Sequence, residues 1–255
     1  MIVPDTGKDT PDIAEDWYAR AFGSLYPMLY AHRSVEAAAP EAAFAIEELS
    51  LSPADRVLDL CCGAGRHMVY LKQRTPCLTG VDYSPQLLDL ARQQLGSCAR
   101  LIRADMRALP FAGAFDALTN FFTSFGYFDD AGNAQTVRCM ARALRPGGRF
   151  FMDYLNAPYA EKALQPRTER TIESLHVVET RWIVGSPRRI NKRTEVIEDG
   201  ATVHRGEESV RLYLPEEILA LLRQFGLEID RTFGDYEGQP LNPGQPRMIM
   251  VGHRT

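Results

Sequence analysis

The sequence predicts an α/β protein built on a doubly wound, mostly parallel sheet of seven strands. Short apolar segments alternate with helical segments between residues 56 and 154, which is the pattern of βαβ units. Right-handed crossovers place the helices of such units on both faces of the sheet. The chain has 255 residues, 45% of them hydrophobic, which suits one domain of this class carrying an insertion.

The core elements are predicted from local signals. Five strands are expected at residues 56–60, 77–81, 100–104, 115–120 and 149–154, and helices at 67–74, 85–95 and 133–144. Ser84 is a favourable N-cap for the second helix because Pro85 takes the first helical position. The Pro-Gly-Gly sequence at 146–148 ends the third helix.

The segments before the core are helical or irregular. Residues 1–12 are polar and are predicted to be frayed. Residues 13–30 are rich in aromatic side chains, and Pro27 divides them into one or two short helices. A longer helix is expected from Pro40 to about residue 49.

The pattern changes after residue 156. Alternating polar and apolar residues predict three antiparallel strands at 173–184, 189–198 and 201–213, and Asp199-Gly200 is a hairpin turn signal. A helix then starts at Pro215 and ends at Gly226, and closing strands follow at 227–233 and 247–253. The second pattern is therefore an insertion into the first.

Composition narrows the class of protein. The net charge of -4 and the absence of a Lys/Arg-rich run argue against a nucleic-acid partner. Five scattered cysteines without a CxxC pair suggest a reducing compartment and no structural zinc or other metal site. The first residues do not resemble a signal peptide, and no apolar run is long enough to span a membrane. We therefore expect a cytoplasmic protein without a membrane partner.

A glycine turn follows the first strand, in the stretch VLDLCCGAGRH at residues 57–67. Gly63 and Gly65 allow the backbone to turn sharply and approach a ligand, and the next helix N-terminus favours a carboxylate there. Met68 stands where a dinucleotide fingerprint needs its third glycine, and the Gly-Lys-Ser/Thr of a P-loop is absent. A dinucleotide or nucleoside triphosphate ligand is therefore disfavoured.

Two carboxylates follow the next two strands. Asp82, in GVDYS, lies 23 residues after Asp59, the spacing at which an acidic side chain reaches ribose hydroxyls. Asp105, in RADM, could accept a hydrogen bond from an adenine amino group. Together with the glycine turn they predict a site for an adenosine ligand.

At this point the chain resembles the class I S-adenosylmethionine-dependent methyltransferases. The resemblance lies in VLDLCCGAGRH, GVDYS, RADMRALPF, FDALTNFFTSFGYF, LRPGGRF, LYLPEEILALLRQFGLEI and GDYEG, and extends from about Asp16 to Thr255. It implies a Rossmann-like fold and S-adenosylmethionine as cofactor, whereas the motifs do not specify the substrate. Members of this family usually have glycine where Cys61 stands; because cysteine is small, we expect the turn to be retained.

The resemblance also implies the cofactor contacts and three parts of the chain. The methionine moiety would contact Gly63, Ala64 and Gly65, and Asp59 would lie below its amino group. The ribose would bind to Asp82, and the adenine would contact Tyr83, Asp105 and Met106. The sulfonium would lie near Asn120 and Phe121. Residues 1–50 would form a helical lid, in which Arg33 could pair with the cofactor carboxylate. Residues 51–156 and 214–255 would form the cofactor-binding core, and 157–213 the antiparallel insertion.

Aromatic side chains are the most conspicuous candidates for the reaction centre. A sulfonium is a cation, and each aromatic face attracts a cation by roughly 0.5–2 kcal/mol. Phe122 and Phe128 are interpreted as core residues. The candidates for the catalytic wall are Tyr26, Tyr30, Asn120, Phe125 and Tyr154.

The insertion has two interpretations. It either forms the substrate-side wall, where Arg181, Trp182 and Tyr213 could reach the cavity, or it forms the face of a homodimer. Alternation places only one face of each strand inward, and the pattern does not indicate which face.

Methyl transfer to a nitrogen or oxygen of a small molecule, as in small-molecule biosynthesis, is the leading hypothesis. The alternative keeps the cofactor but changes the bond broken. It is cyclisation of S-adenosylmethionine to azetidine-2-carboxylate with release of methylthioadenosine, or transfer of the aminocarboxypropyl group. A domain that binds the cofactor without turnover is a third hypothesis, and a dinucleotide oxidoreductase is the fallback if the cofactor does not bind.

Overall fold

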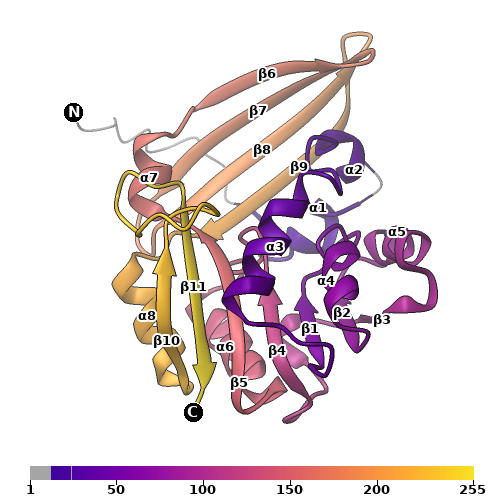
Figure 1. Cartoon of the computed structure of the whole chain (residues 1–255). Coiled ribbons are helices and arrows are strands. Elements are labelled where there is room, and N and C mark those ends of the chain that lie inside the picture. The colour runs from indigo at the N-terminus through magenta and orange to yellow at the C-terminus, as the bar shows by residue number, and fades with distance from the viewer. Residues whose placement is uncertain (1–12, 24) are drawn as a thin grey trace.

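The computed structural model describes residues 13–23 and 25–255; the predicted frayed segment 1–12 lies outside them. Its core is a seven-stranded sheet with helices on both faces (Figure 1). In spatial order the strands are β10 (Leu227–Phe233), β11 (Arg247–Arg254), β5 (Leu144–Leu155), β4 (Phe115–Asn120), β1 (Val57–Leu60), β2 (Leu78–Asp82) and β3 (Arg100–Arg103). Only β11 runs antiparallel to its neighbours. The predicted fold class is therefore confirmed.

The core helices begin and end close to the predicted positions. They are α3 (Ala38–Glu48), α4 (Met68–Arg74), α5 (Pro85–Leu95), α6 (Asp130–Ala143) and α8 (Pro215–Gln224), with 3₁₀ turns η1 (Gly96–Cys98) and η2 (Met106–Ala108). Ser84 Oγ accepts a hydrogen bond from the Leu87 N–H at 3.2 Å, as expected of an N-cap. Helix α6 starts three residues earlier than predicted because Asp129 caps it through the Gly132 N–H at 2.7 Å.

Each central strand is buried on both faces. Phe150 and Phe151 are adjacent in β5, yet Phe150 packs in the hydrophobic cluster with α6 and α8, and Phe151 packs in the cluster with α3, α4 and α5. Leu118 and Ala117 of β4 divide in the same way. Successive side chains of a strand point to opposite faces, so each continuous apolar run supplies two cores.

The insertion forms a second sheet of four antiparallel strands. They are β6 (Arg167–Ile172), β7 (Leu175–Val184), β8 (Arg189–Glu198) and β9 (Ala201–Arg211), in that spatial order, and α7 (Ala157–Lys162) leads into them. The sequence predicts only the last three strands. Strand β6 was missed because it is an edge strand whose sequence, RTERTI, has few apolar residues. In Figure 1 this sheet extends beyond the carboxyl ends of the parallel strands.

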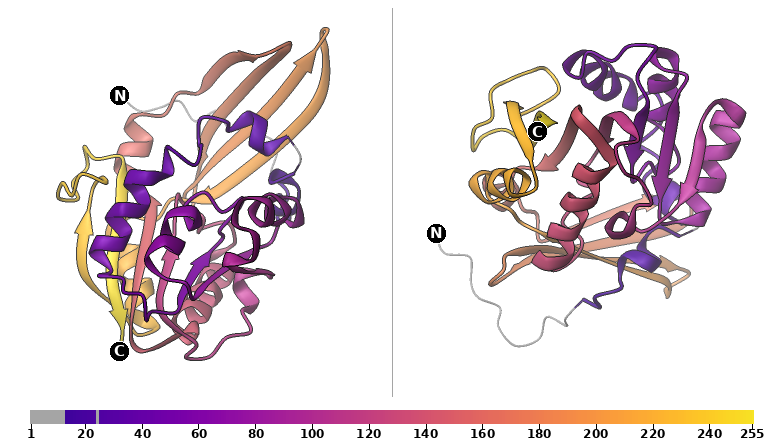
Figure 2. Two further views of the ribbon diagram at one scale, coloured as in Figure 1. Left: turned by 45° about the vertical axis from the view of Figure 1, so that its right-hand side comes forward. Right: turned by 90° about the horizontal axis from the view of Figure 1, so that it is seen from below.

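Two short helices of the N-terminal segment lie beside the insertion, as the views in Figures 1 and 2 agree. They are α1 (Tyr18–Ala21) and α2 (Tyr26–Leu29). Leu29 and Tyr30 pack against Val177 of β7 and Val196 of β8 in a separate hydrophobic cluster. Among the described residues, no helix has both the length and the apolar character needed to cross a membrane.

Candidate functional site

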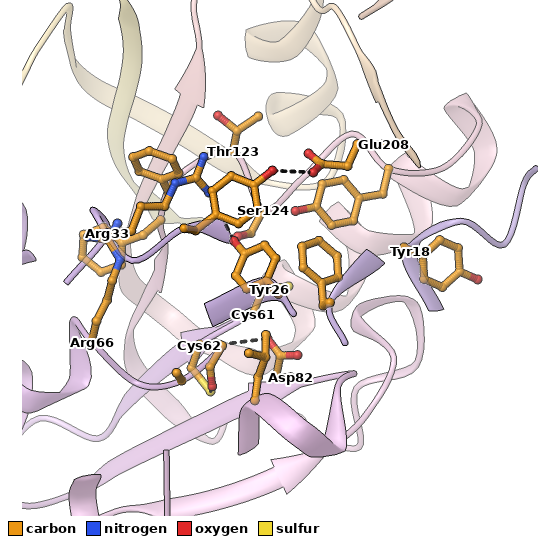
Figure 3. A pocket seen from close by; sticks show the side chains of 18 of the residues that line it. Tyr18, Tyr26, Arg33, Cys61, Cys62, Arg66, Asp82, Thr123, Ser124 and Glu208 are labelled. Carbon is orange, nitrogen blue, oxygen red and sulfur yellow. Dashed lines mark hydrogen bonds between the residues drawn. The ribbon is translucent and has the colours of Figure 1, made fainter. Parts of the chain in front are cut away.

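A cavity of about 650 Å³ lies between the core, the short N-terminal helices and the insertion. Its wall includes Gly63 from the turn after β1, Asp82 from the end of β2, Tyr26 from α2, and Lys192 and Glu208 from the second sheet. In Figure 3, Asp82 lies on one side of this cavity, Glu208 lies on the other, and Tyr26 lies between them. The volume is within the range of roughly 300–1,000 Å³ that is usual for small-molecule sites.

The glycine turn has the conformation that its sequence predicts. Gly63 and Gly65 have φ angles of 55° and 81°, in the left-handed region that favours glycine. A Cβ on Gly65 would lie 3.1 Å from Leu95 Cδ1 and 3.3 Å from Ala91 Cβ, so α5 packs directly on the turn. Cys61 also has a left-handed φ of 61°. The left-handed φ explains why glycine is favoured at position 61, and the turn keeps this conformation with cysteine there.

The departure from a dinucleotide fingerprint at Met68 has a local explanation. Met68 is fully buried, and its Sδ lies 2.6 Å from the position that a Cβ on Gly80 would occupy. Gly80 belongs to β2, so the strand contributes the glycine that lets helix and sheet pack closely. A large side chain at the start of α4 is therefore compatible with this turn.

Asp59 presents an unpartnered oxygen at the cavity. Its side chain is only 2% exposed, and Thr119 Oγ1 donates to Oδ1 at 2.8 Å. Oδ2 is buried, and no described residue forms a hydrogen bond with it. Burial raises the pKa of this carboxyl to about 7. A ligand amino group would satisfy Oδ2, which fits the role that the resemblance implies for Asp59.

Asp82 organises the turn and faces the cavity. Its Oδ2 accepts from the Gly63 N–H and its Oδ1 from the Ser84 N–H, both at 2.8 Å. Each oxygen can still accept from a ribose hydroxyl. Tyr83, the next residue, borders the cavity and is 39% exposed, so its ring is available to an adenine.

Asp105 and Met106 lie at the same edge of the cavity. Asp105 Oδ2 is 2.6 Å from Arg107 Nη2, which also donates to Tyr18 Oη at 2.9 Å. Although burial opposes it, Arg107 lowers the pKa of Asp105. The carboxylate is thus already oriented by a guanidinium, a contact that the sequence did not indicate. Cys61 Sγ lies 3.9 Å from Met106 Sδ and connects this edge with the glycine turn.

Arg33 lies between two rings at the cavity wall. Its guanidinium carbon is 4.2 Å from the centre of the Tyr30 ring and 4.3 Å from that of Phe122, and Nη1 donates to Tyr26 Oη at 3.2 Å. Among the described residues no carboxylate lies within ion-pair distance of Arg33. Its positive charge is therefore available to an anionic group of a ligand.

Phe121 borders the cavity and stacks on a histidine. The ring centres of Phe121 and His67 are 3.8 Å apart, with an angle of 10° between the planes. His67 Nε2 lies 2.7 Å from Glu41 Oε2. Burial lowers the pKa of His67 to about 4, so the ring is neutral at pH 7. The histidine thus supports the wall by packing.

Three of the five candidates for the catalytic wall lie elsewhere, which corrects the sequence interpretation. Asn120, Phe125 and Tyr154 are at most 1% exposed and do not line the cavity. Asn120 Nδ2 instead bonds the carbonyls of Leu60 and Ser124, and Tyr154 Oη donates to the Arg211 carbonyl. Polar groups buried in this way hold the core together.

The structure places other aromatic residues at the cavity instead. Tyr26 and Tyr30 line it as predicted, and Phe122 and Phe128, which were interpreted as core residues, line it as well. Phe122 and Thr123 have left-handed φ angles of 59° and 62°, which turn this part of the loop toward the cavity. An aromatic-rich loop does not show from its sequence which rings point inward, because loops have no fixed period.

The second sheet contributes three polar residues to the cavity, of which the sequence indicated only Arg181. Arg181, Lys192 and Glu208 are cross-strand neighbours on β7, β8 and β9, and all three line the cavity. Trp182 and Tyr213, the other two candidates from the insertion, do not line it. Because side chains alternate along a strand, placing Arg181 on the cavity face puts Trp182 on the opposite face.

Comparisons with known proteins agree with the core motifs. Residues 57–148 match the family model described as a methyltransferase domain. The chain is 41% identical over 116 residues to demethylmenaquinone methyltransferase from Deinococcus radiodurans, covering 43% of this chain and 46% of that protein. The chain spans about half the length of the curated relatives that it matches first.

Solved structures match over a larger part of the chain. An S-adenosylmethionine-dependent methyltransferase from Clostridium acetobutylicum aligns with a TM-score of 0.75 at 19% identity, covering 90% of this chain and 96% of that one. The sugar N-methyltransferase KedS8 from a Streptoalloteichus species aligns with a TM-score of 0.68 at 25% identity, covering 100% and 98%. Residues 57–148 therefore match a methyltransferase domain, and the chain has the fold of solved S-adenosylmethionine-dependent methyltransferases, as its motifs predict.

Proposed function

We propose that this chain transfers a methyl group from S-adenosylmethionine to a nitrogen or oxygen atom of a small-molecule acceptor. The observation that carries the proposal is that one cavity is lined both by the cofactor motifs and by the polar residues Arg181, Lys192 and Glu208 of the second sheet. A nucleophile bound on the sheet side would face a sulfonium held on the turn side. Methyl transfer requires little beyond this positioning, because the cofactor supplies an activated methyl group when it is bound.

The residues present fit S-adenosylmethionine. Among residues 13–23 and 25–255, Asp59 Oδ2 has no hydrogen-bond partner and suits an amino group, and Arg33 has no carboxylate partner and suits a carboxylate. Asp82 and Tyr83 would hold the ribose and the adenine. We infer that the aromatic wall, including Tyr26 and Phe128, attracts the sulfonium charge.

The tyrosines of the wall are positioning groups in this proposal. Burial raises the pKa values of Tyr26 and Tyr30 above 10, so both remain neutral phenols at pH 7. Their rings can attract the sulfonium, and their hydroxyls orient Arg33 and Glu208. Neither is poised to remove a proton from an acceptor.

The relatives favour nitrogen over a quinone carbon as the acceptor. The match to demethylmenaquinone methyltransferase covers less than half of this chain, whereas KedS8, named as a sugar N-methyltransferase, aligns over its whole length. We also infer three parts with separate roles: a lid (1–50), a cofactor-binding core (51–156 and 214–255) and a substrate-side cap (157–213). A cytoplasmic location and a homodimer stay predictions.

The affinity for the cofactor should depend on pH through Asp59. With a pKa of about 7, this carboxyl is mostly protonated at pH 6 and mostly ionised at pH 8. Only the ionised form pairs with a ligand ammonium, so S-adenosylhomocysteine, which shares the amino acid moiety, should bind roughly tenfold more tightly at pH 8. Calorimetry at both pH values measures this change. Asp59→Asn should remove it, and a flat profile in the wild type would contradict the role of Asp59.

Incubation of the purified protein with S-adenosylmethionine tests the reaction itself. We expect the cofactor alone to be bound but not consumed, and S-adenosylhomocysteine to form when amine or hydroxyl acceptors are added, as followed by mass spectrometry. Methylthioadenosine above the no-enzyme background would instead show cyclisation or aminocarboxypropyl transfer. Failure to bind the cofactor would rule out all of these reactions.

A further inference from the structure

We propose that the acceptor is a small amine that binds to Glu208 on the second sheet as its ammonium and gives one proton to Oε2 of this carboxylate. The neutral nitrogen then attacks the methyl carbon, and the bond from that carbon to sulfur breaks as the new N–C bond forms, which leaves S-adenosylhomocysteine. This inference rests on the proposed function, because it assumes that the cavity side opposite the glycine turn receives the acceptor. It goes further by naming the chemical class of the acceptor and the residue that selects it.

Glu208 is held in place by two elements of the fold. Lys192 Nζ lies 2.6 Å from Glu208 Oε1, and Tyr30 Oη donates to the same oxygen at 2.8 Å. Lys192 also donates to Tyr30 Oη, which closes a three-membered hydrogen-bonded group. Tyr30 follows α2 and the other two lie on β8 and β9, so the carboxylate has a defined position only when lid and insertion are packed together.

Glu208 keeps one carboxylate oxygen that can accept a hydrogen bond from a ligand. Both bonds from the protein go to Oε1 of Glu208, and no described residue donates to Oε2. The side chain of Glu208 keeps 29% of its surface accessible and borders the cavity. A ligand that meets Oε2 must therefore present an N–H or O–H donor.

The cations of the same wall are engaged with carboxylates. Lys192 is paired with Glu208, and Arg181 and Arg170 share Glu179, whose side chain is only 5% exposed. An acceptor with a carboxylate or phosphate would thus compete with Glu208 and Glu179 for these cations. An ammonium would find a carboxylate oxygen, and a charge-assisted hydrogen bond is stronger than one between neutral groups.

The rings around Glu208 favour a cation as well. The ring centres of Tyr26 and Tyr30 are 4.5 Å apart, and Phe22 stacks on Tyr127 at 5.9 Å. All four rings line the cavity; Arg33 and Lys192 already lie over the Tyr30 ring, which leaves Tyr26, Phe22 and Tyr127 for a ligand cation. Aromatic faces attract an ammonium but give a neutral hydroxyl no comparable gain. An amine therefore suits this wall better than an alcohol of the same shape.

Binding of matched probes to the complex with S-adenosylhomocysteine tests the inference without turnover. The probes are 2-phenylethylamine with 2-phenylethanol, and glucosamine with glucose, measured by calorimetry. We expect the wild type to prefer at least one amine over its neutral partner. Glu208→Gln should lower the affinity for that amine by about ten- to a hundredfold and change the affinity for S-adenosylhomocysteine by less than about twofold.

Two further variants separate charge from structure. Glu207→Gln removes the neighbouring pair with Arg193 at 2.7 Å, which alternation places on the opposite face, and should leave amine binding unchanged. Lys192→Met removes the internal cation from Glu208 and should strengthen amine binding, whereas a merely structural role would weaken it.

The inference is overturned if amine and neutral partner bind equally, if Glu208→Gln binds the amine as the wild type does, or if Lys192→Met and Glu208→Gln lose affinity together. Failure of the proposed function has a separate signature. In that case, S-adenosylmethionine does not bind to the wild type, or no S-adenosylhomocysteine forms with any acceptor.

Discussion

Asp153→Ala should lower the free energy of unfolding by about 3–5 kcal/mol, because it leaves a buried guanidinium without its carboxylate. Asp153 is fully buried on β5, and its Oδ1 lies 2.6 Å from Arg247 Nε of β11. Its Oδ2 accepts from the Phe122 N–H at 2.8 Å and from Tyr236 Oη at 2.7 Å. One carboxylate thus satisfies three donors that have little access to water.

The same substitution should also disturb the cavity wall. Arg247 lines the cavity and donates to Thr123 Oγ1 at 3.0 Å, while Phe122 and Thr123 have left-handed φ angles. Without Asp153 this loop loses the contacts that hold its conformation.

Urea unfolding followed by circular dichroism measures the stability of Asp153→Ala. Asp230→Ala is the matched control, since Asp230 pairs with His253 on the surface at 3.0 Å and should change stability by less than about 1 kcal/mol. A loss of under about 1 kcal/mol in Asp153→Ala would mean that Arg247 is solvated or finds another partner.

Asp82→Ala should weaken the binding of S-adenosylmethionine by about ten- to a hundredfold. Loss of charge-assisted hydrogen bonds to the ribose costs roughly 1.5–3 kcal/mol, and 1.36 kcal/mol corresponds to a factor of ten. The variant also leaves the N–H groups of Gly63 and Ser84 without their acceptor, which adds to the loss by loosening the turn.

A thermodynamic cycle that combines Asp82→Ala with a modified ligand separates the loss of the ribose hydrogen bonds from the loosening of the turn. S-adenosylhomocysteine without the two ribose hydroxyls should bind more weakly than the intact ligand to the wild type, but equally to Asp82→Ala. Asp89→Ala, an exposed position of α5 paired with Arg92, should change neither affinity by more than twofold. If Asp82→Ala still discriminates between the two ligands, the hydroxyls bind elsewhere.

The cofactor side of the site was predictable because its determinants are local. The strand, the left-handed glycines and the carboxylates at strand ends are encoded within short segments, and parallel strands bring their carboxyl ends to one edge of a sheet. Gly63, Asp82 and Asp105 therefore line one cavity, and their contacts with the cofactor stay a prediction. The small size of Cys61 was enough to predict that the turn is retained, although only the structure shows that this residue has a left-handed φ.

The reaction side was predicted only in part because it depends on which face of each element points inward. Phe125 and Tyr154 resemble cavity residues in the sequence, yet they pack with Tyr213 in the core. Phe122 and Phe128 look like core residues, yet they line the cavity. Aromatic residues suit both environments, and their composition alone does not distinguish them.

By itself, the sequence determined the class of fold, a site for an adenosine ligand and the edge of the sheet at which its motifs gather. Those features follow from hydrophobic period, turn chemistry and spacing within about 30 residues, and the resemblance to the class I methyltransferases added the identity of the cofactor. Only the tertiary structure decided the opposite wall. Tyr30 and Glu208 are 178 residues apart and meet because the N-terminal segment and the insertion pack against each other. No local pattern encodes that meeting, since the inward face of the insertion is chosen by strand register and packing.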